Sequence, residues 1–193
     1  MSKSEQVGSE KTGKKTDVFM LTVTALMSAV ICILGPLSIA IPISPVPISL
    51  TIFGIYLAVY VLGMKWGTIS CIVYILLGMA GLPVFSGFSG GIAKLAGPTG
   101  GYIIGYIFLA LICGYFIDRF PAKRAMHVAG MIIGVIVCYA FGTIWLCYQM
   151  QIGFIAGLWA GVIPYLPADA VKIALAVMIG PVLRWQLNKI RRR

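Results

Sequence analysis

The two residues best suited to chemistry in this sequence are a carboxylate and an ammonium three positions apart, Asp169 and Lys172. They lie in a long apolar stretch that follows Pro164 and Pro167. Residues three apart on a helix share one face, so both side chains point the same way, and Tyr165 continues that face. Ionisable groups in such a stretch are costly and usually mark a functional site. We therefore interpret Asp169, Lys172 and Tyr165 as ligand-binding residues.

An alternative interpretation is that the Asp169–Lys172 pair only neutralises itself and pins two helices together. The two prolines just before the pair favour the ligand site, because they predict an opened, irregular start to the helix. Irregular backbone at membrane depth is tolerated where it lines a cavity or is covered by protein.

Two Gly/Pro-rich segments are candidates for the rest of a binding site: residues 41–49 (IPISPVPIS) and the loop from 81 to 101. A connection of about 20 residues is usually a lid or a binding loop. Gly90 and Gly91 would let backbone groups approach a ligand closely. Phe85 and Tyr102 offer flat faces, so these segments favour a small planar solute over a bare ion.

Other chemistry-bearing patterns are missing from the sequence. There is no phosphate-binding G-x-x-x-x-G-K-[ST] motif, no nucleophile elbow and no H-E-x-x-H pair. The five cysteines lack metal-ligand spacing, and His127 is the single histidine. We expect neither an enzyme nor a metal site.

A pair of small residues in the first apolar stretch, Ala25 and Ala29, has the small-xxx-small spacing of helix–helix contacts. The spacing recurs at Gly101/Gly105 and at Gly130/Gly134, where it is typical of packing within one protein.

Composition shows which elements must position these residues. The chain of 193 residues is 60% hydrophobic and 10% charged, against about 25% charged for a soluble domain. The net charge of +10 does not indicate a nucleic-acid partner, because the basic residues flank apolar stretches as in membrane proteins. The sequence predicts an all-α integral membrane protein.

The apolar stretches predict six transmembrane helices in a single membrane domain, residues 18–190. Residues 1–17 are polar with four lysines, so we expect a disordered cytoplasmic tail there. A tight turn at residues 63–67 separates the second and third spans. Residues 148–163 are expected to form an outer loop that lies in the membrane interface or dips into it. The predicted spans are 18–40, 48–62, 68–80, 102–117, 125–147 and 165–187.

The basic residues decide the number of spans. With six spans and a cytoplasmic N-terminus, all but Lys94 and Lys172 of the 15 basic residues lie in inner segments. A seventh span at 148–163 would place the tail KIRRR outside, against the positive-inside tendency. Both termini are therefore expected in the cytoplasm.

With these residues in view, the chain resembles the BioY family, the biotin-specific substrate-binding subunits of energy-coupling factor transporters. The resemblance rests on PVPISLTIFGIYLAVYVLG (45–63), YILLGMAGLPVF (74–85), GPTGGYIIGY (97–106) and LPADAVK (166–172). The family often has Thr-Leu-Gln after Pro-Val-Pro; here Ile48-Ser49-Leu50-Thr51 departs from that pattern.

The resemblance implies a subunit in a bacterial plasma membrane that binds biotin with high affinity on its outer side and needs no cofactor. It also implies two kinds of partner, a transmembrane coupling subunit and two cytoplasmic ATPases. The small residues of the first helix, here Ala25 and Ala29, would contact the coupling subunit. The planar ureido group of biotin suits the charged pair, because Asp169 can accept from its N–H groups and Lys172 can donate to its oxygen.

The main rival is a stand-alone secondary transporter that uses Asp169 as a proton or sodium site. No two-half repeat with paired broken helices is visible in the sequence, which disfavours that interpretation. A channel is disfavoured as well, because one Asp–Lys pair does not make a selectivity ring.

Overall fold

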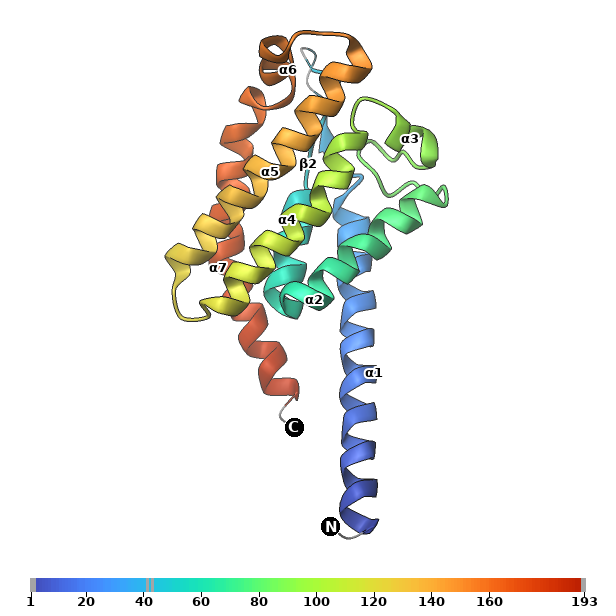
Figure 1. Cartoon of the computed structure of the whole chain (residues 1–193), viewed down its shortest axis with the longest axis vertical. Coiled ribbons are helices and arrows are strands. Elements are labelled where there is room, and N and C mark those ends of the chain that lie inside the picture. The colour runs from blue at the N-terminus through green and yellow to red at the C-terminus, as the bar shows by residue number, and fades with distance from the viewer. Residues whose placement is uncertain (1–2, 41, 43, 192–193) are drawn as a thin grey trace.

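A computed structural model describes residues 3–40, 42 and 44–191 as a bundle of long helices (Figure 1). α1 (Lys3–Leu34) leads through a two-stranded antiparallel ribbon, β1 (Ser38–Ile39) and β2 (Ile48–Ser49), into α2 (Thr51–Met79). The rest of the chain adds α3 (Ile92–Ala96), α4 (Gly100–Arg119), α5 (Arg124–Met150), α6 (Phe154–Gly161), the 3-10 turn η1 (Ile163–Tyr165) and α7 (Leu166–Arg191).

The helices are long and apolar enough to cross a membrane at four places: α2, α4, α5 and the stretch Phe154–Arg191, while Val18–Leu34 is a shorter apolar helix. α2 consists of two arms, because Gly63 interrupts it with non-helical backbone (φ 76°, ψ −173°). Counting both arms, the described residues form six long helical segments: α1, the arms of α2, α4, α5 and α7. The predicted number of helices is confirmed.

The break between the second and third spans is tighter than predicted. Only Gly63 leaves the helical conformation, whereas a turn over residues 63–67 was expected. Asp118, near the end of α4, explains why one residue is enough for the break, because its Oδ2 accepts a hydrogen bond from the Met64 backbone N–H at 2.7 Å. A carboxylate there satisfies an otherwise free N–H at the start of the second arm.

The first helix also differs from expectation at both ends. It stops at Leu34 rather than near residue 40, and the chain then turns at Gly35-Pro36 into the ribbon. At its other end the helix continues back to Lys3, whereas residues 1–17 were expected to be disordered. Extending an existing helix needs no new nucleation, so a polar segment joined to an apolar helix can continue it.

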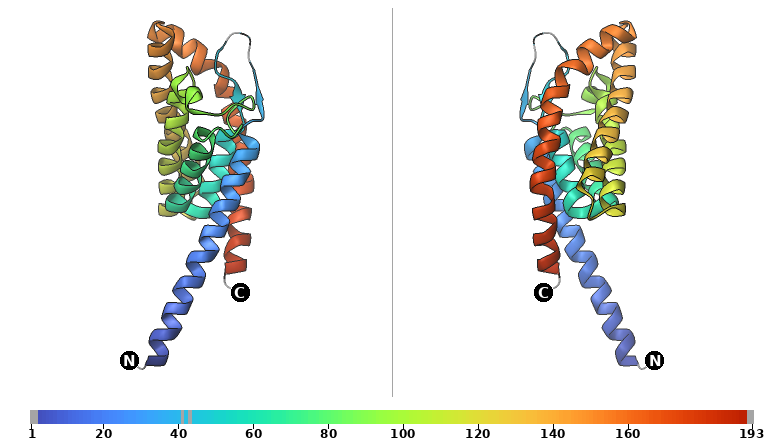
Figure 2. Two further views of the ribbon diagram at one scale, coloured as in Figure 1. Left: turned by 90° about the vertical axis from the view of Figure 1, so that its right-hand side faces the viewer. Right: turned by 90° about the vertical axis from the view of Figure 1, so that its left-hand side faces the viewer.

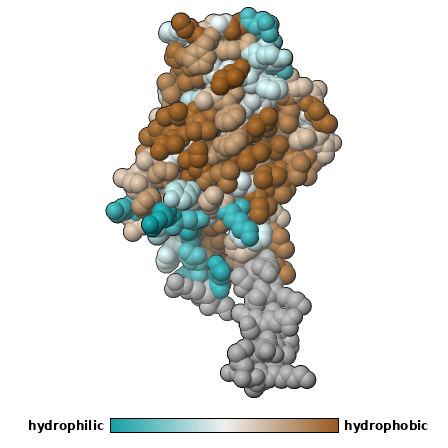
Figure 3. All heavy atoms as spheres, in the orientation of Figure 1, coloured by the Kyte–Doolittle hydropathy of each residue, from teal (hydrophilic) through white to brown (hydrophobic). Residues whose placement is uncertain are grey.

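Both termini lie at the same end of the bundle, and α3 and α6 lie at the other (Figures 1 and 2). Apolar residues cover the middle of the visible face, and hydrophilic residues gather toward the end with the termini (Figure 3). Residues 148–163, expected as an outer loop, include the last turn of α5 and the short helix α6 at the end opposite the termini.

Candidate functional site

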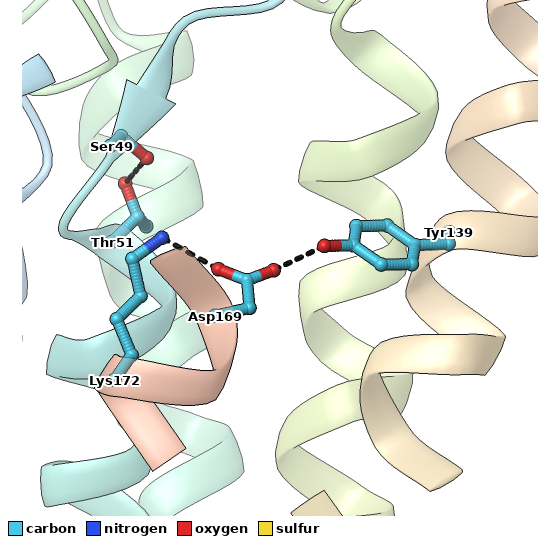
Figure 4. Close-up of polar contacts among 5 residues, drawn as sticks. All are labelled: Ser49, Thr51, Tyr139, Asp169 and Lys172. Atoms are coloured by element: carbon cyan, nitrogen blue, oxygen red, sulfur yellow. Dashed lines mark hydrogen bonds and ion pairs between the residues drawn. The ribbon is translucent and has the colours of Figure 1, made fainter. Parts of the chain in front are cut away.

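Asp169 is the centre of the candidate site and lies in the first turn of α7. Pro167 is accommodated beside it, because backbone N–H groups in a first turn have no intrahelical partner. Lys172 Nζ lies 2.7 Å from Asp169 Oδ1 (Figure 4). Both residues are buried, with exposed fractions of 3% and 6%. The predicted meeting of these two side chains on one helix face is confirmed.

Tyr139 of α5 completes the arrangement around the carboxylate, and the sequence analysis missed it. Its buried hydroxyl donates a hydrogen bond to Asp169 Oδ2 (Figure 4). Each carboxylate oxygen thus accepts one bond from the protein and keeps a lone pair for another donor. The signal available was a tyrosine inside an apolar span, which normally needs a partner for its hydroxyl.

A small cavity of about 40 Å³ lies beside this carboxylate, and a second of about 20 Å³ adjoins the first. Four of the predicted binding residues line the first cavity: Asp169, Lys172, Tyr165 and Tyr102. The second cavity extends from shared residues toward the loop before α4. The residues common to both cavities come from the segment after the ribbon turn and from α4: Val46, Pro47, Ser49, Tyr102 and Tyr106.

Tyr165, just before α7, is hydrogen-bonded to the loop between β1 and β2 beside the cavity. Its hydroxyl donates to the Val46 carbonyl and lies 2.6 Å from Ser44 Oγ. Ser44 in turn lies 2.5 Å from the carbonyl oxygen of Ala160 in α6. These contacts hold residues 44–46, the roof segment, against the end of the bundle opposite the termini.

Tyr102 of α4 forms another wall, and its position depends on glycine. Its hydroxyl donates to the Gly161 carbonyl at 3.0 Å. A Cβ at Gly161 would lie 2.0 Å from that hydroxyl oxygen, and one at Gly142 would lie 2.2 Å from the ring. A side chain at either position would therefore push Tyr102 out of place.

The structure does not bring Phe85, Gly90 and Gly91 to the cavity. Phe85 is buried against Tyr74, with ring centroids 5.6 Å apart in an edge-to-face arrangement. The Gly91 N–H donates to the Gly78 carbonyl at 2.7 Å, so it is not available to a ligand. A Cβ at Gly90 would lie 2.3 Å from the Leu82 carbonyl oxygen, which gives this glycine a packing role.

From the same loop the structure instead places Ser86 and Thr99 at the second cavity. Thr99 Oγ1 is buried with no hydrogen-bond partner among the described residues. Buried polar groups are nearly always paired, so this hydroxyl is a candidate contact for a ligand. Nothing in the local pattern around Thr99 distinguished it from other loop hydroxyls.

Comparison with known proteins decides the family. A profile of the BioY family matches residues 8–189. The chain belongs to the BioY family. It is 37% identical to the biotin transporter BioY of Thermotoga maritima over 73% of this chain and 82% of that protein. It is 38% identical to the biotin transporter BioY of Lactococcus lactis over 86% of this chain and 90% of that protein.

A solved structure matches almost the whole chain. It is the crystal structure of the S-component for biotin from an ECF-type ABC transporter, with a TM-score of 0.80 and 34% identity. The match covers 95% of this chain and 94% of that one. BioY proteins are transporter subunits rather than enzymes, as the sequence predicted.

The segments that carry the BioY resemblance converge on the cavity. PVPIS supplies Ser49 and the last two residues of the roof segment, GPTGG supplies Thr99 at the start of α4, and LPADAVK supplies the charged pair. Ser49 Oγ lies 2.9 Å from Thr51 Oγ1 beside Lys172 (Figure 4). Segments distant in sequence are therefore neighbours at this place.

The small residues of α1 differ from those of later helices. Ala25 and Ala29 are exposed. Gly105 and Gly134, in contrast, are buried where α4 meets α5, so that an added Cβ would lie 2.9 and 3.0 Å from Cys138 and Cys113 Sγ. The face around Ala25 and Ala29 is not used for packing within the described chain.

Proposed function

We propose that this BioY protein captures biotin on the outer side of a bacterial plasma membrane, as the substrate-binding subunit of an ATP-driven vitamin transporter. The observation that carries the proposal is the buried Asp169–Lys172 pair, joined by Tyr139, at the wall of a cavity built from the BioY-like segments. The relatives named as biotin transporters support biotin as the ligand.

The chemistry of the pair suits the ureido group of biotin. Asp169 has lone pairs left after its bonds to Lys172 and Tyr139, and it accepts from the two ureido N–H groups. Lys172 has donors left and binds the ureido oxygen. Both contacts are charge-assisted, which strengthens them relative to neutral hydrogen bonds.

Binding in the two small cavities beneath the roof segment requires this segment to move. The two cavities have room for a few water molecules, whereas ligand pockets measure ~300–1,000 Å³. The contacts of Ser44 with Ala160 and Tyr165 and the bond from Tyr165 to the Val46 carbonyl are the ones that must open. Because they join a loop to helix ends, their opening leaves the helix bundle intact.

The energy for uptake would come from other chains. The structural neighbour is an S-component of an ECF-type ABC transporter, which supports a coupling subunit and two ATPases as partners. The exposed Ala25–Ala29 face of α1 allows close approach of a helix from the coupling subunit.

Isothermal titration calorimetry on the purified chain tests the proposal, with biotin as titrant and thiamine and riboflavin as controls. We expect tight one-site binding of biotin alone. Uptake in cells that express the chain with and without coupling and ATPase subunits then shows whether the energy comes from ATP hydrolysis by those partners or from a proton gradient. Proton-driven uptake by the chain alone would support the rival secondary transporter.

A further inference from the structure

The seam between α5 and α7 carries a basic cavity that biotin capture does not use and a groove that extends from the direction of that cavity to the biotin site. At the end with the termini, a cavity of about 350 Å³ is lined by Arg124 and His127 of α5 and by Arg184, Trp185 and Asn188 of α7. Nearer the other end, a groove of about 500 Å³ runs between the same two helices and α6; its lining is almost entirely apolar, and Tyr139 and Asp169 of the biotin site also line it. We propose that this seam binds an anionic phospholipid, with its phosphate in the basic cavity and an acyl chain along the groove.

The basic cavity offers donors suited to a phosphate. Arg184 is bonded to Asp118 at 2.8 Å, and its guanidinium has further N–H donors. Arg124 is exposed and bonded to no acid among the described side chains, so it supplies the net positive charge. His127 has both ring nitrogens engaged, one with Tyr60 and one with the Phe120 carbonyl, and forms the floor of the cavity.

The place of the cavity in the bundle selects a lipid over a soluble phosphate. Most of its lining residues come from the start of α5 and the C-terminal half of α7, at the end of the bundle toward which hydrophilic residues gather (Figure 3). Trp185 in its lining is 59% exposed, as is typical of interfacial aromatics. Basic pockets between membrane helices at this depth suit lipid headgroups.

The apolar groove lies within reach of an acyl chain from that headgroup. Its lining includes Ile132 and Ile136 of α5 and Ile173 of α7. A helical rise of ~1.5 Å per residue puts Ile173 roughly 16 Å along α7 from Arg184. That distance is about half of the ~30 Å hydrocarbon core, the depth covered by the chains of one leaflet. The right-hand view of Figure 2 shows α7 and α5 side by side along this length.

Native mass spectrometry of the delipidated chain tests the proposal by titration with phosphatidylglycerol, phosphatidylcholine and glycerol 3-phosphate. We expect phosphatidylglycerol to bind at least fivefold more tightly than phosphatidylcholine, and glycerol 3-phosphate not to compete. Arg124→Gln should weaken phosphatidylglycerol binding about fivefold, since one basic residue near a membrane surface is worth ~1 kcal/mol. Lys123→Gln removes the same charge from the neighbouring position outside the cavity and should leave binding unchanged.

A second pair of variants tests the acyl-chain part. Ile132 lines the groove and is exposed, so Ile132→Trp should fill the end of the groove nearest the basic cavity and weaken phosphatidylglycerol binding, whereas Ile133→Trp, exposed on α5 outside the groove, should not. A thermal melt of each variant confirms that it is folded.

Three results would overturn the proposal. Equal losses in Arg124→Gln and Lys123→Gln would reduce the effect to general surface charge. Competition by glycerol 3-phosphate would make the cavity a site for soluble phosphate. Loss of lipid when the chain is assembled with its coupling subunit would assign the seam to a protein interface.

Discussion

At the scale of single residues, the site is organised by how a buried carboxylate satisfies its oxygens. Asp169 accepts from Lys172 on one oxygen and from Tyr139 on the other, and all three side chains are buried. Removing one partner of a buried ion pair costs ~3–5 kcal/mol, because a charge is left unpaired. Tyr139 is the one member whose loss leaves the two charges balanced.

Tyr139→Phe therefore tests whether the orientation of the carboxylate contributes to biotin binding. The change keeps the ring and removes one hydrogen bond to a charged group, worth ~1.5–3 kcal/mol. If the hydroxyl positions Asp169 for the ureido group, affinity should fall roughly 10- to 100-fold in calorimetry. Tyr148→Phe removes an equivalent hydroxyl from an exposed position and serves as the control. If Tyr139→Phe binds biotin with wild-type affinity, the Tyr139–Asp169 hydrogen bond only holds α5 against α7 and does not contribute to binding.

Sequence reasoning found the charged members of the site and missed the neutral ones. Asp169 and Lys172 are conspicuous because charges are rare in apolar spans. Tyr139, Ser44 and Thr99 carry hydroxyls, which occur throughout the chain. Only the tertiary structure places Tyr139 at the first cavity, Thr99 at the second and Ser44 in the roof segment. Gly90 and Gly91 were predicted as backbone contacts, yet their local hydrogen bonding and packing serve the loop itself.

At the scale of elements, the two arms of α2 depend on Gly63. Its φ of 76° with extended ψ is a region almost restricted to glycine. A Cβ there would also lie 2.7 Å from Asp118 Oδ2, the oxygen that accepts from Met64. The break that makes two membrane helices from one hydrophobic stretch is thus held by a glycine and a carboxylate.

Gly63→Ala should therefore destabilise the chain by ~1–3 kcal/mol from backbone strain, with a further loss if Asp118 is displaced. Thermal melting in detergent measures the change. Gly153→Ala is the matched control, because its φ is −66° and an added Cβ would have no atom within 4 Å. Equal melting temperatures for the two variants would show that the break does not need glycine.

The exposed face of α1 gives a second prediction for an element. Ala25→Trp with Ala29→Trp should keep biotin binding and lose ATP-dependent uptake and co-purification with the coupling subunit, because bulky groups prevent close helix approach. Both positions lie outside the biotin cavity. Assembly of the double variant with the coupling subunit would move the docking face elsewhere.

At the scale of the whole molecule, charge distribution and apolar length predicted the six helices and the common end of both termini. Helix boundaries were less predictable, since Gly63 rather than a five-residue turn ends the first arm of α2. The ribbon between α1 and α2 was not predicted either, because its two-residue strands are too short to show a pattern.

The orientation in the membrane remains a prediction for the whole molecule. We expect Lys94 on the outer side and Lys189 on the cytoplasmic side, following the positive-inside tendency. Single cysteines at these positions in a cysteine-free background can be labelled on intact cells with a membrane-impermeant reagent. Position 94 should react and position 189 should react only after permeabilisation. Strong labelling of position 189 on intact cells would reverse the assignment.

The most direct measurement for the account is biotin calorimetry on the double variant Asp169→Asn with Lys172→Met, with a thermal melt on the same sample. Removing both charges leaves neither one unpaired, so the chain should remain folded. If the pair binds the ureido group, affinity for biotin should still fall roughly 10- to 100-fold or more, because the loss of even one hydrogen bond to a charged group lowers affinity by about that factor. A folded double variant that binds biotin as tightly as the wild type would contradict the account and leave the pair a link within the helix bundle.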